Sequence, residues 1–159
     1  MASQPPILID PTRLGQVDQV LPPIATLASS PTDNPGILLM HYDQLPAHEV
    51  PEYQSLHHVV AIWGQQSQAQ LEAQFDDDYR WQGLFGRGEA GIIPAGMNHW
   101  AVWDRPISLS LLFLHPQFVR QVASELVKGD RLELIPKHAT QDPALSQLGL
   151  LLKTDLQEG

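Results

Sequence analysis

The residues best suited to chemistry lie between positions 88 and 103, where one histidine and two tryptophans follow a run of turn-forming residues. Pro94 fixes its φ angle and has no backbone donor, and Gly96 permits the positive φ that a tight turn often needs. The strand predicted after this turn alternates its side chains between two faces, so His99 and Trp103 share one face. A single polar ring on an apolar face can contact a ligand, hold a metal ion, or hydrogen-bond within the core.

Other kinds of catalytic chemistry find little support in the sequence. There is no cysteine, and none of the serines lies in a Gly-x-Ser-x-Gly elbow that would present a nucleophile. Asp76 to Asp78 form a polar run in a predicted exposed turn, which is not the buried setting that acid–base catalysis by a carboxyl pair requires. The glycines at 83, 86 and 88 precede a strand, so the helix N-terminus that would bind phosphate is missing.

Alternating or wholly apolar runs predict the elements that position His99 and Trp103. The predicted strands before the 88–103 stretch are 37–42, 56–63, 67–75 and 79–85, the last two paired as a hairpin across the aspartates. Residues 107–114 are almost all apolar, which suits a strand covered on both faces, and we expect the helix predicted at 116–128 to supply that cover. A short strand at 131–134 and a last helix starting at Asp142-Pro143 complete the predicted order.

Length and composition indicate one folded domain of 159 residues. The formal charge is −9, which repels nucleic acid and acidic membranes, so this chain alone should not bind DNA. No apolar run reaches the ~20 residues of a membrane span, and the N-terminus lacks the plan of a signal peptide. The absence of cysteine fits a reducing compartment. We therefore expect a cytoplasmic protein with no membrane partner.

The two ends of the chain are predicted to have special roles. Residues 1–36 contain seven of the fourteen prolines, which indicates an extended N-terminal arm that lies over a body at 37–135. Residues 136–159 are predicted as a linker and a leucine-rich helix. The leucines of this helix form more than the single stripe that would dock on the body, because some lie on the sides and the rear of the helix. The candidate dimerisation residues are Leu148, Leu150, Leu151 and Leu152.

The 88–103 stretch resembles the second conserved motif of the cupin superfamily, with Gly88, Pro94, Gly96 and His99 at matching positions and Trp103 where that motif has asparagine. The order of motifs over about residues 56–158 is similar to the N-terminal sensor domain of AraC-type transcriptional regulators. The blocks that carry this resemblance are Leu56 to Trp63, Gly91 to His99, Leu112 to Phe118, Arg131 to Leu134 and Gln141 to Leu145.

This resemblance implies a mainly β fold, a cupin-like double-stranded β-helix or jelly-roll barrel with two C-terminal helices. It also implies a domain that binds a small organic effector and forms a homodimer through its last helix, with no cofactor and no catalysis. DNA binding would belong to a C-terminal domain outside these residues. The candidate effector contacts are His99, Trp103, His58 and Trp63, although His58 and Trp63 are predicted on opposite faces of one strand and cannot both point inward.

The alternative implied by the cupin resemblance is a small metal-dependent enzyme of the oxygenase or isomerase type. Such an enzyme holds iron, manganese, nickel or zinc with three histidines and often a carboxylate. His99 could supply one ligand, but the chain has no His-x-His pair, and the adjacent His57 and His58 point to opposite faces of a strand. The sequence therefore predicts no metal site, and the enzyme stays an alternative.

Overall fold

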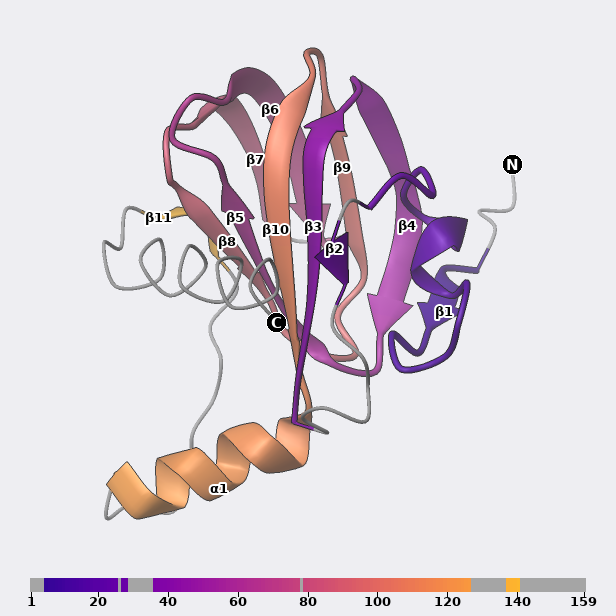
Figure 1. Ribbon diagram of the computed structural model, residues 1–159, viewed down its shortest axis with the longest axis vertical. Coiled ribbons are helices and arrows are strands. Elements are labelled where there is room, and N and C mark those ends of the chain that lie inside the picture. Colours follow the sequence, from indigo (N-terminus) through magenta and orange to yellow (C-terminus); the bar gives the residue numbers. More distant parts are fainter. Residues whose placement is uncertain (1–4, 26, 29–35, 78, 127–136, 141–159) are drawn as a thin grey trace.

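The computed structural model describes residues 5–25, 27–28, 36–77, 79–126 and 137–140. Two β-sheets face each other and enclose the main hydrophobic core (Figure 1). The strands are β1 Ile7–Ile9, β2 Leu27–Ala28, β3 Ile37–Leu45, β4 His48–Ser55, β5 His58–Trp63, β6 Gln68–Phe75, β7 Tyr79–Gly86, β8 Ala90–Ile93, β9 His99–Trp103, β10 Ile107–Leu114 and β11 Lys137–Thr140. The helices are the 3-10 turn η1 Val17–Gln19 and the α-helix α1 Pro116–Leu126.

The strand order defines the fold. One sheet runs β1-β4-β9-β6-β7 and the other β11-β8-β5-β10-β3-β2. Strands β3 to β10 thus form two four-stranded antiparallel layers, β4-β9-β6-β7 against β8-β5-β10-β3. Eight strands divided in this order are a jelly roll, the architecture that cupins share with viral capsid and lectin domains. The mainly β jelly-roll prediction is therefore confirmed.

Most of the predicted barrel strands occur near their expected positions. The hairpin of β6 and β7 turns at the aspartates, with Phe75 opposite Tyr79 in the register and Asp76 at a φ of 47°. Gly96 has a φ of 79° in the turn that carries the chain from β8 in one sheet to β9 in the other, as the sequence predicts. This turn delivers His99 to the first position of β9.

Strand β10 is buried on both faces, as its composition predicts. Leu109, Leu111 and Phe113 belong to the main core between the sheets, whereas Leu112 belongs to a second cluster with Leu39, Val60, Ile62 and Ala90. The expectation that the following helix covers this outer cluster is wrong for the described residues. None of the cluster's described members comes from α1, and the helix extends from the lower end of the barrel in Figure 1.

The prolines of the N-terminal segment do not keep it out of the core. Strand β1 pairs with β4 in parallel, and β2 pairs with β3. Ile9, Val17, Val20 and Leu21 are all buried in the main core. The segment predicted as an arm over the body thus also builds part of its interior.

The predicted C-terminal elements are only partly described. Helix α1 lies at the predicted place. The predicted strand at 131–134, the last helix and the four dimerisation leucines lie outside the described residues. Residues 137–140, which the sequence places in a linker, form β11 and pair with β8. Within the described residues, no helix is both long and apolar enough to cross a membrane.

Candidate functional site

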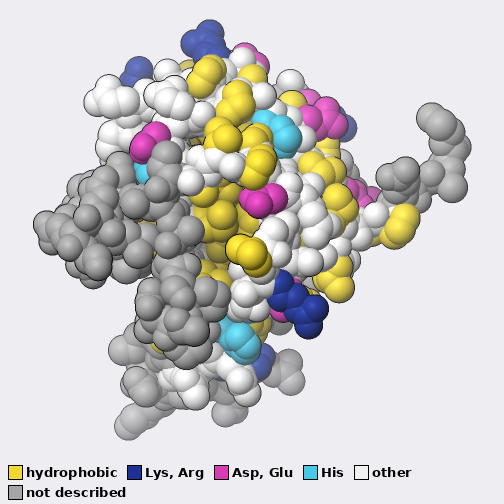
Figure 2. All heavy atoms as spheres, turned by 45° about the vertical axis from the view of Figure 1, so that its right-hand side comes forward, with side chains coloured by type: hydrophobic (Ala, Val, Ile, Leu, Met, Phe, Trp, Pro, Cys, Tyr) yellow, Lys and Arg dark blue, Asp and Glu magenta, His cyan; other side chains and the backbone are white. Residues whose placement is uncertain are grey.

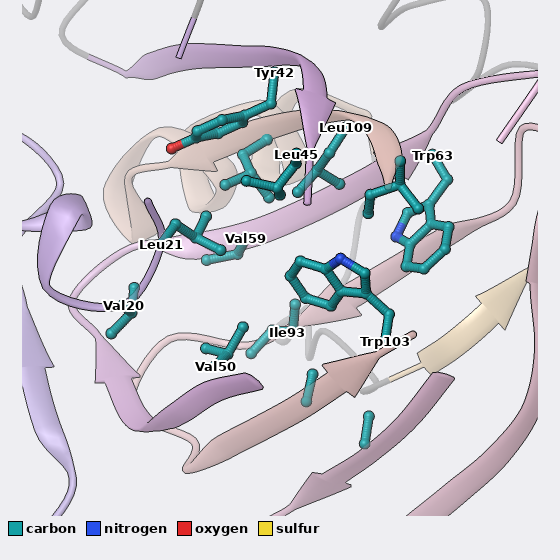
Figure 3. Close-up of a cluster of buried hydrophobic side chains, with 14 of the residues drawn as sticks. Val20, Leu21, Tyr42, Leu45, Val50, Val59, Trp63, Ile93, Trp103 and Leu109 are labelled. Atoms are coloured by element: carbon teal, nitrogen blue, oxygen red, sulfur yellow. The ribbon is translucent and has the colours of Figure 1, made fainter. Parts of the chain in front are cut away.

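The space between the two sheets contains a cavity of about 80 Å³. Side chains from both layers and from the N-terminal segment line it, including Val17, Leu21, Trp63, Phe85, His99 and Trp103. Figure 2 shows the surface of the molecule. Figure 3 shows part of the wall, where Trp63 of β5 and Trp103 of β9 point toward each other. The polar atoms of the wall are few, so the chemistry of the wall suits an apolar molecule better than a strongly hydrated one.

An aromatic group forms one end of the cavity. The rings of Trp63 and Phe85 have centroids 4.6 Å apart in an edge-to-face arrangement, and those of Trp63 and Trp103 are 6.2 Å apart. The indole Nε1–H of Trp103 donates to the backbone oxygen of Pro46 at 3.0 Å. Trp103 is therefore held in place by the β3–β4 turn, and its face packs at the cavity while its donor is occupied.

His99 lies at the other end of β9 and also lines the cavity. It is 8% exposed, and its Nδ1 shares a hydrogen bond of 3.2 Å with the hydroxyl of Tyr53 on the paired strand β4. Burial raises the pKa of Tyr53 well above its ordinary range, so this hydroxyl stays neutral. Tyr53 lines the cavity too, and the sequence reasoning missed it because β4 was not predicted.

His58 does not line the cavity, and its assignment as an effector contact is not supported by its position. It starts β5 and lies five residues before Trp63, so the two side chains point to opposite faces of the strand. Its Nδ1 accepts a hydrogen bond from the backbone N–H of Ala95 at 2.9 Å. Burial, then the neighbouring His57 and Arg120, lower the pKa of His58. His58 therefore holds the Pro94-Ala95-Gly96 turn that precedes His99.

The N-terminal segment closes one side of the cavity. Ile9, Val17, Val20 and Leu21 all contribute to the wall, and the Nε2–H of His48 donates to the backbone oxygen of Val20 at 2.9 Å. Val17, Val20 and Leu21 have the i, i+3, i+4 spacing of one helical face and start at the turn η1, but Pro11 and Gly15 separate them from Ile9, and the sequence is interpreted as an extended arm. A molecule in the cavity would touch the segment and the barrel at once.

The donor set of the cavity does not fit a transition metal. Among its described lining residues His99 is the single imidazole, and none is a carboxylate. The described part of the chain contains no group of three or more histidine, aspartate or glutamate side chains able to hold a metal ion. His41 is buried elsewhere, with Nε2–H donating to Asp43 at 2.9 Å and Nδ1 accepting from the Ser110 hydroxyl at 2.8 Å.

These features define the class of protein as a jelly-roll barrel with an apolar internal cavity. No family model matches the sequence, and no curated protein matches it either. Solved structures resemble parts of the chain, among them a tryptophan-to-tyrosine variant of oxalate decarboxylase from Bacillus subtilis. That match has 14% identity and a TM-score of 0.45, and it covers 59% of this chain but only 26% of the decarboxylase chain.

Two other solved structures show a similar degree of likeness. KdgF from Halomonas sp. has 17% identity and a TM-score of 0.40, over 52% of this chain and 72% of its own. The CENP-C cupin domain of Drosophila melanogaster has 13% identity and a TM-score of 0.35, over 48% of this chain and 59% of its own. The jelly-roll assignment rests on the strand order described above.

Proposed function

We propose that this chain is a cupin-like sensor domain that binds a small organic effector inside its barrel, as part of an AraC-type transcriptional regulator. The observation that carries the effector-binding part is the cavity of about 80 Å³ between the sheets, with an apolar wall and one buried polar pair. Ligand sites in proteins are concave, mostly apolar and fixed by a few polar groups, which this cavity matches.

The composition of the wall suggests how binding would be transmitted. Four buried residues of the N-terminal segment line the cavity together with strands from both sheets. An effector can shift a conformational equilibrium only through contacts that differ between the two states. A molecule that packs against Val17 and Leu21 would favour the arrangement in which this segment is docked on the barrel. Occupancy would thereby alter the surface that the segment forms.

The proposal includes a homodimer formed through the leucine-rich segment with Leu148, Leu150, Leu151 and Leu152. DNA binding would belong to a basic domain outside these 159 residues, since a formal charge of −9 opposes contact with phosphate. The reading frame after the codon for Gly159 tests this part. An encoded helix-turn-helix segment would support a regulator, and a stop codon at that point would count against it.

Filling the cavity tests effector binding. Ala73 of β6 lines the cavity and is 1% exposed, so Ala73→Leu adds an isopropyl group to the space a ligand would occupy. Ala47→Leu, at an exposed position in the β3–β4 turn, makes the same chemical change away from the cavity. A library of small organic molecules is screened by thermal shift on the wild type and both variants.

We expect molecules that raise the Tm of the wild type and of Ala47→Leu but not of Ala73→Leu. A ligand at 100 times its Kd stabilises the fold by about 2.7 kcal/mol, which a thermal shift detects. Stabilisation that persists in a folded Ala73→Leu variant would place the ligand elsewhere and contradict the proposal.

A further inference from the structure

The cavity wall contains no charged side chain among the described residues that line it. Its polar atoms come from the Tyr53–His99 pair and from the indole rings of Trp63 and Trp103. An ion that leaves water for such surroundings, with no counterion beside it, loses several kcal/mol of solvation that the wall does not return. The raised pKa of Tyr53 reflects the same effect, because burial disfavours its charged form. The wall therefore selects against carboxylates and amines.

The indole donors of the two tryptophans differ. The Nε1–H of Trp103 is bonded to Pro46, and the Tyr53 hydroxyl is bonded to His99. Trp63 is 4% exposed, and no hydrogen bond joins its Nε1–H to another residue of the described part of the chain. Figure 3 shows the indole nitrogen of Trp63 on the side that faces the interior of the cluster. Unlike the Tyr42 hydroxyl and the ring nitrogens of His57, this nitrogen is not completely buried, so an acceptor in the cavity can reach it and supply the partner that an indole N–H usually has.

The two polar positions lie far apart along the barrel. Trp63 packs next to Trp103, whereas the Tyr53–His99 pair lies at the other end of β9, four residues away. Four residues of strand span roughly 13 Å. The cavity has a volume of about 80 Å³, which at about 15 Å³ for each water-sized group is room for roughly five such groups. A molecule of that size reaches one polar position and not both.

We propose that the cavity binds a small uncharged molecule of about four carbons, with one acceptor oxygen that takes the Nε1–H of Trp63, such as a short-chain ketone or alcohol. This inference rests on the proposed effector-binding function and specifies its ligand class. The hydrocarbon part of the ligand packs against Trp103 and Phe85, and its oxygen supplies the hydrogen bond that the protein does not.

The probes for the test are butanone, n-butanol, butyrate and n-butylammonium, which have the same number of carbons and differ in charge. Two-dimensional proton–nitrogen NMR of the nitrogen-labelled protein follows the indole N–H signals of the four tryptophans. The variant Trp63→Phe assigns the Trp63 signal and removes the donor. Trp81→Phe is the matched control, because Trp81 of β7 is not among the residues that line the cavity.

We expect butanone and n-butanol to move the Trp63 indole signal in the wild type. Trp63→Phe should weaken butanone about 3- to 10-fold, the effect of one neutral hydrogen bond, while Trp81→Phe leaves it unchanged. Butyrate and n-butylammonium should bind at least about 100-fold more weakly than butanone.

Each result that contradicts these expectations identifies a different part of the proposal as wrong. If none of the four probes binds, the cavity does not act as a ligand site and the proposed function fails with it. If butyrate or n-butylammonium binds as well as butanone, the uncharged ligand class is wrong while the cavity still functions. If butanone binds without moving the Trp63 signal, and Trp63→Phe binds it equally well, the assignment of the acceptor to Trp63 is overturned.

Discussion

Acid should weaken this fold through His57, which lies in the turn between β4 and β5. The side chain is 5% exposed, and both of its ring nitrogens are buried without a hydrogen-bond partner. The ring of His115, just before α1, packs against it at right angles with centroids 5.0 Å apart. Burial and the charge of a protonated His115 lower the pKa of His57, and the carboxylate of Asp10 opposes them. His57 is therefore held neutral at the junction of the N-terminal segment, the barrel and α1.

The sign of the pH effect follows from this lowered pKa. Below the unfolded-state pKa of 6.5, the unfolded chain binds a proton at His57 that the folded chain does not, so stability falls as the pH falls. Between the folded-state and the unfolded-state pKa of His57, the unfolded chain binds nearly one proton more than the folded chain. The free energy of unfolding then falls by about 1.4 kcal/mol for each pH unit. Asp10 offers little compensation, because its carboxylate already accepts from Thr12 and pairs with Arg13. The pKa of His58 shifts in the same direction, so the wild-type slope contains both contributions.

The variant His57→Leu isolates the contribution of His57. Urea unfolding followed by tryptophan fluorescence gives the free energy of unfolding of both proteins from pH 8 to pH 5. At pH 8 the variant should equal or exceed the wild type by about 1–3 kcal/mol, because two unsatisfied polar atoms are removed. Its advantage should then grow by up to about 1.4 kcal/mol per unit below pH 6.5.

Leu56→Ala provides the control for this experiment, since Leu56 is the preceding residue, is 49% exposed and does not titrate. Its difference from the wild type should stay constant with pH. Parallel pH profiles for the wild type and His57→Leu would refute the argument, because they would mean that His57 is equally easy to protonate in the folded and unfolded chain.

Two further predictions concern a pair of glycines and the proposed dimer. At Gly86, φ is 144° and an added Cβ would lie 2.1 Å from the backbone oxygen of Ser67, whereas Gly96 has a φ of 79° and open space. Gly86→Ala should lower the free energy of unfolding by about 3 kcal/mol or more, and Gly96→Ala by about 1–2 kcal/mol. Urea unfolding measures both values, and equal losses for the two variants would disprove the clash at Gly86. Leu150→Glu and Leu151→Glu should weaken self-association by about tenfold or more with the fold retained, and unchanged sedimentation of both variants would remove these leucines from the interface.

Hydrophobic alternation predicts the barrel where it is uninterrupted, and the prediction fails where proline or charge breaks the pattern. Strands β6, β9 and β10 follow from period-two alternation or continuous apolar runs. Strand β4 contains Pro51 and two glutamates, and it pairs with β9 through a register shift between Val50 and Tyr53. Proline is tolerated at such an irregularity because no ladder hydrogen bond is needed there. The missed strand hid Tyr53, the partner of His99.

The candidate site, like the fold, is predicted only in part by the sequence pattern. Alternation along β9 correctly places His99 and Trp103 on the interior face, and the rule that positions five apart face opposite ways correctly separates His58 from Trp63. The spacing of residues in the sequence does not indicate which polar atom on that face already has a hydrogen-bond partner. Trp103 stands where the cupin motif has asparagine, yet its N–H is taken by Pro46, a residue far away in the chain. Among the described residues that line the cavity, the indole donor without a partner belongs to Trp63, on the facing sheet, so the chemistry of the cavity depends on tertiary hydrogen bonding that neither strand encodes alone.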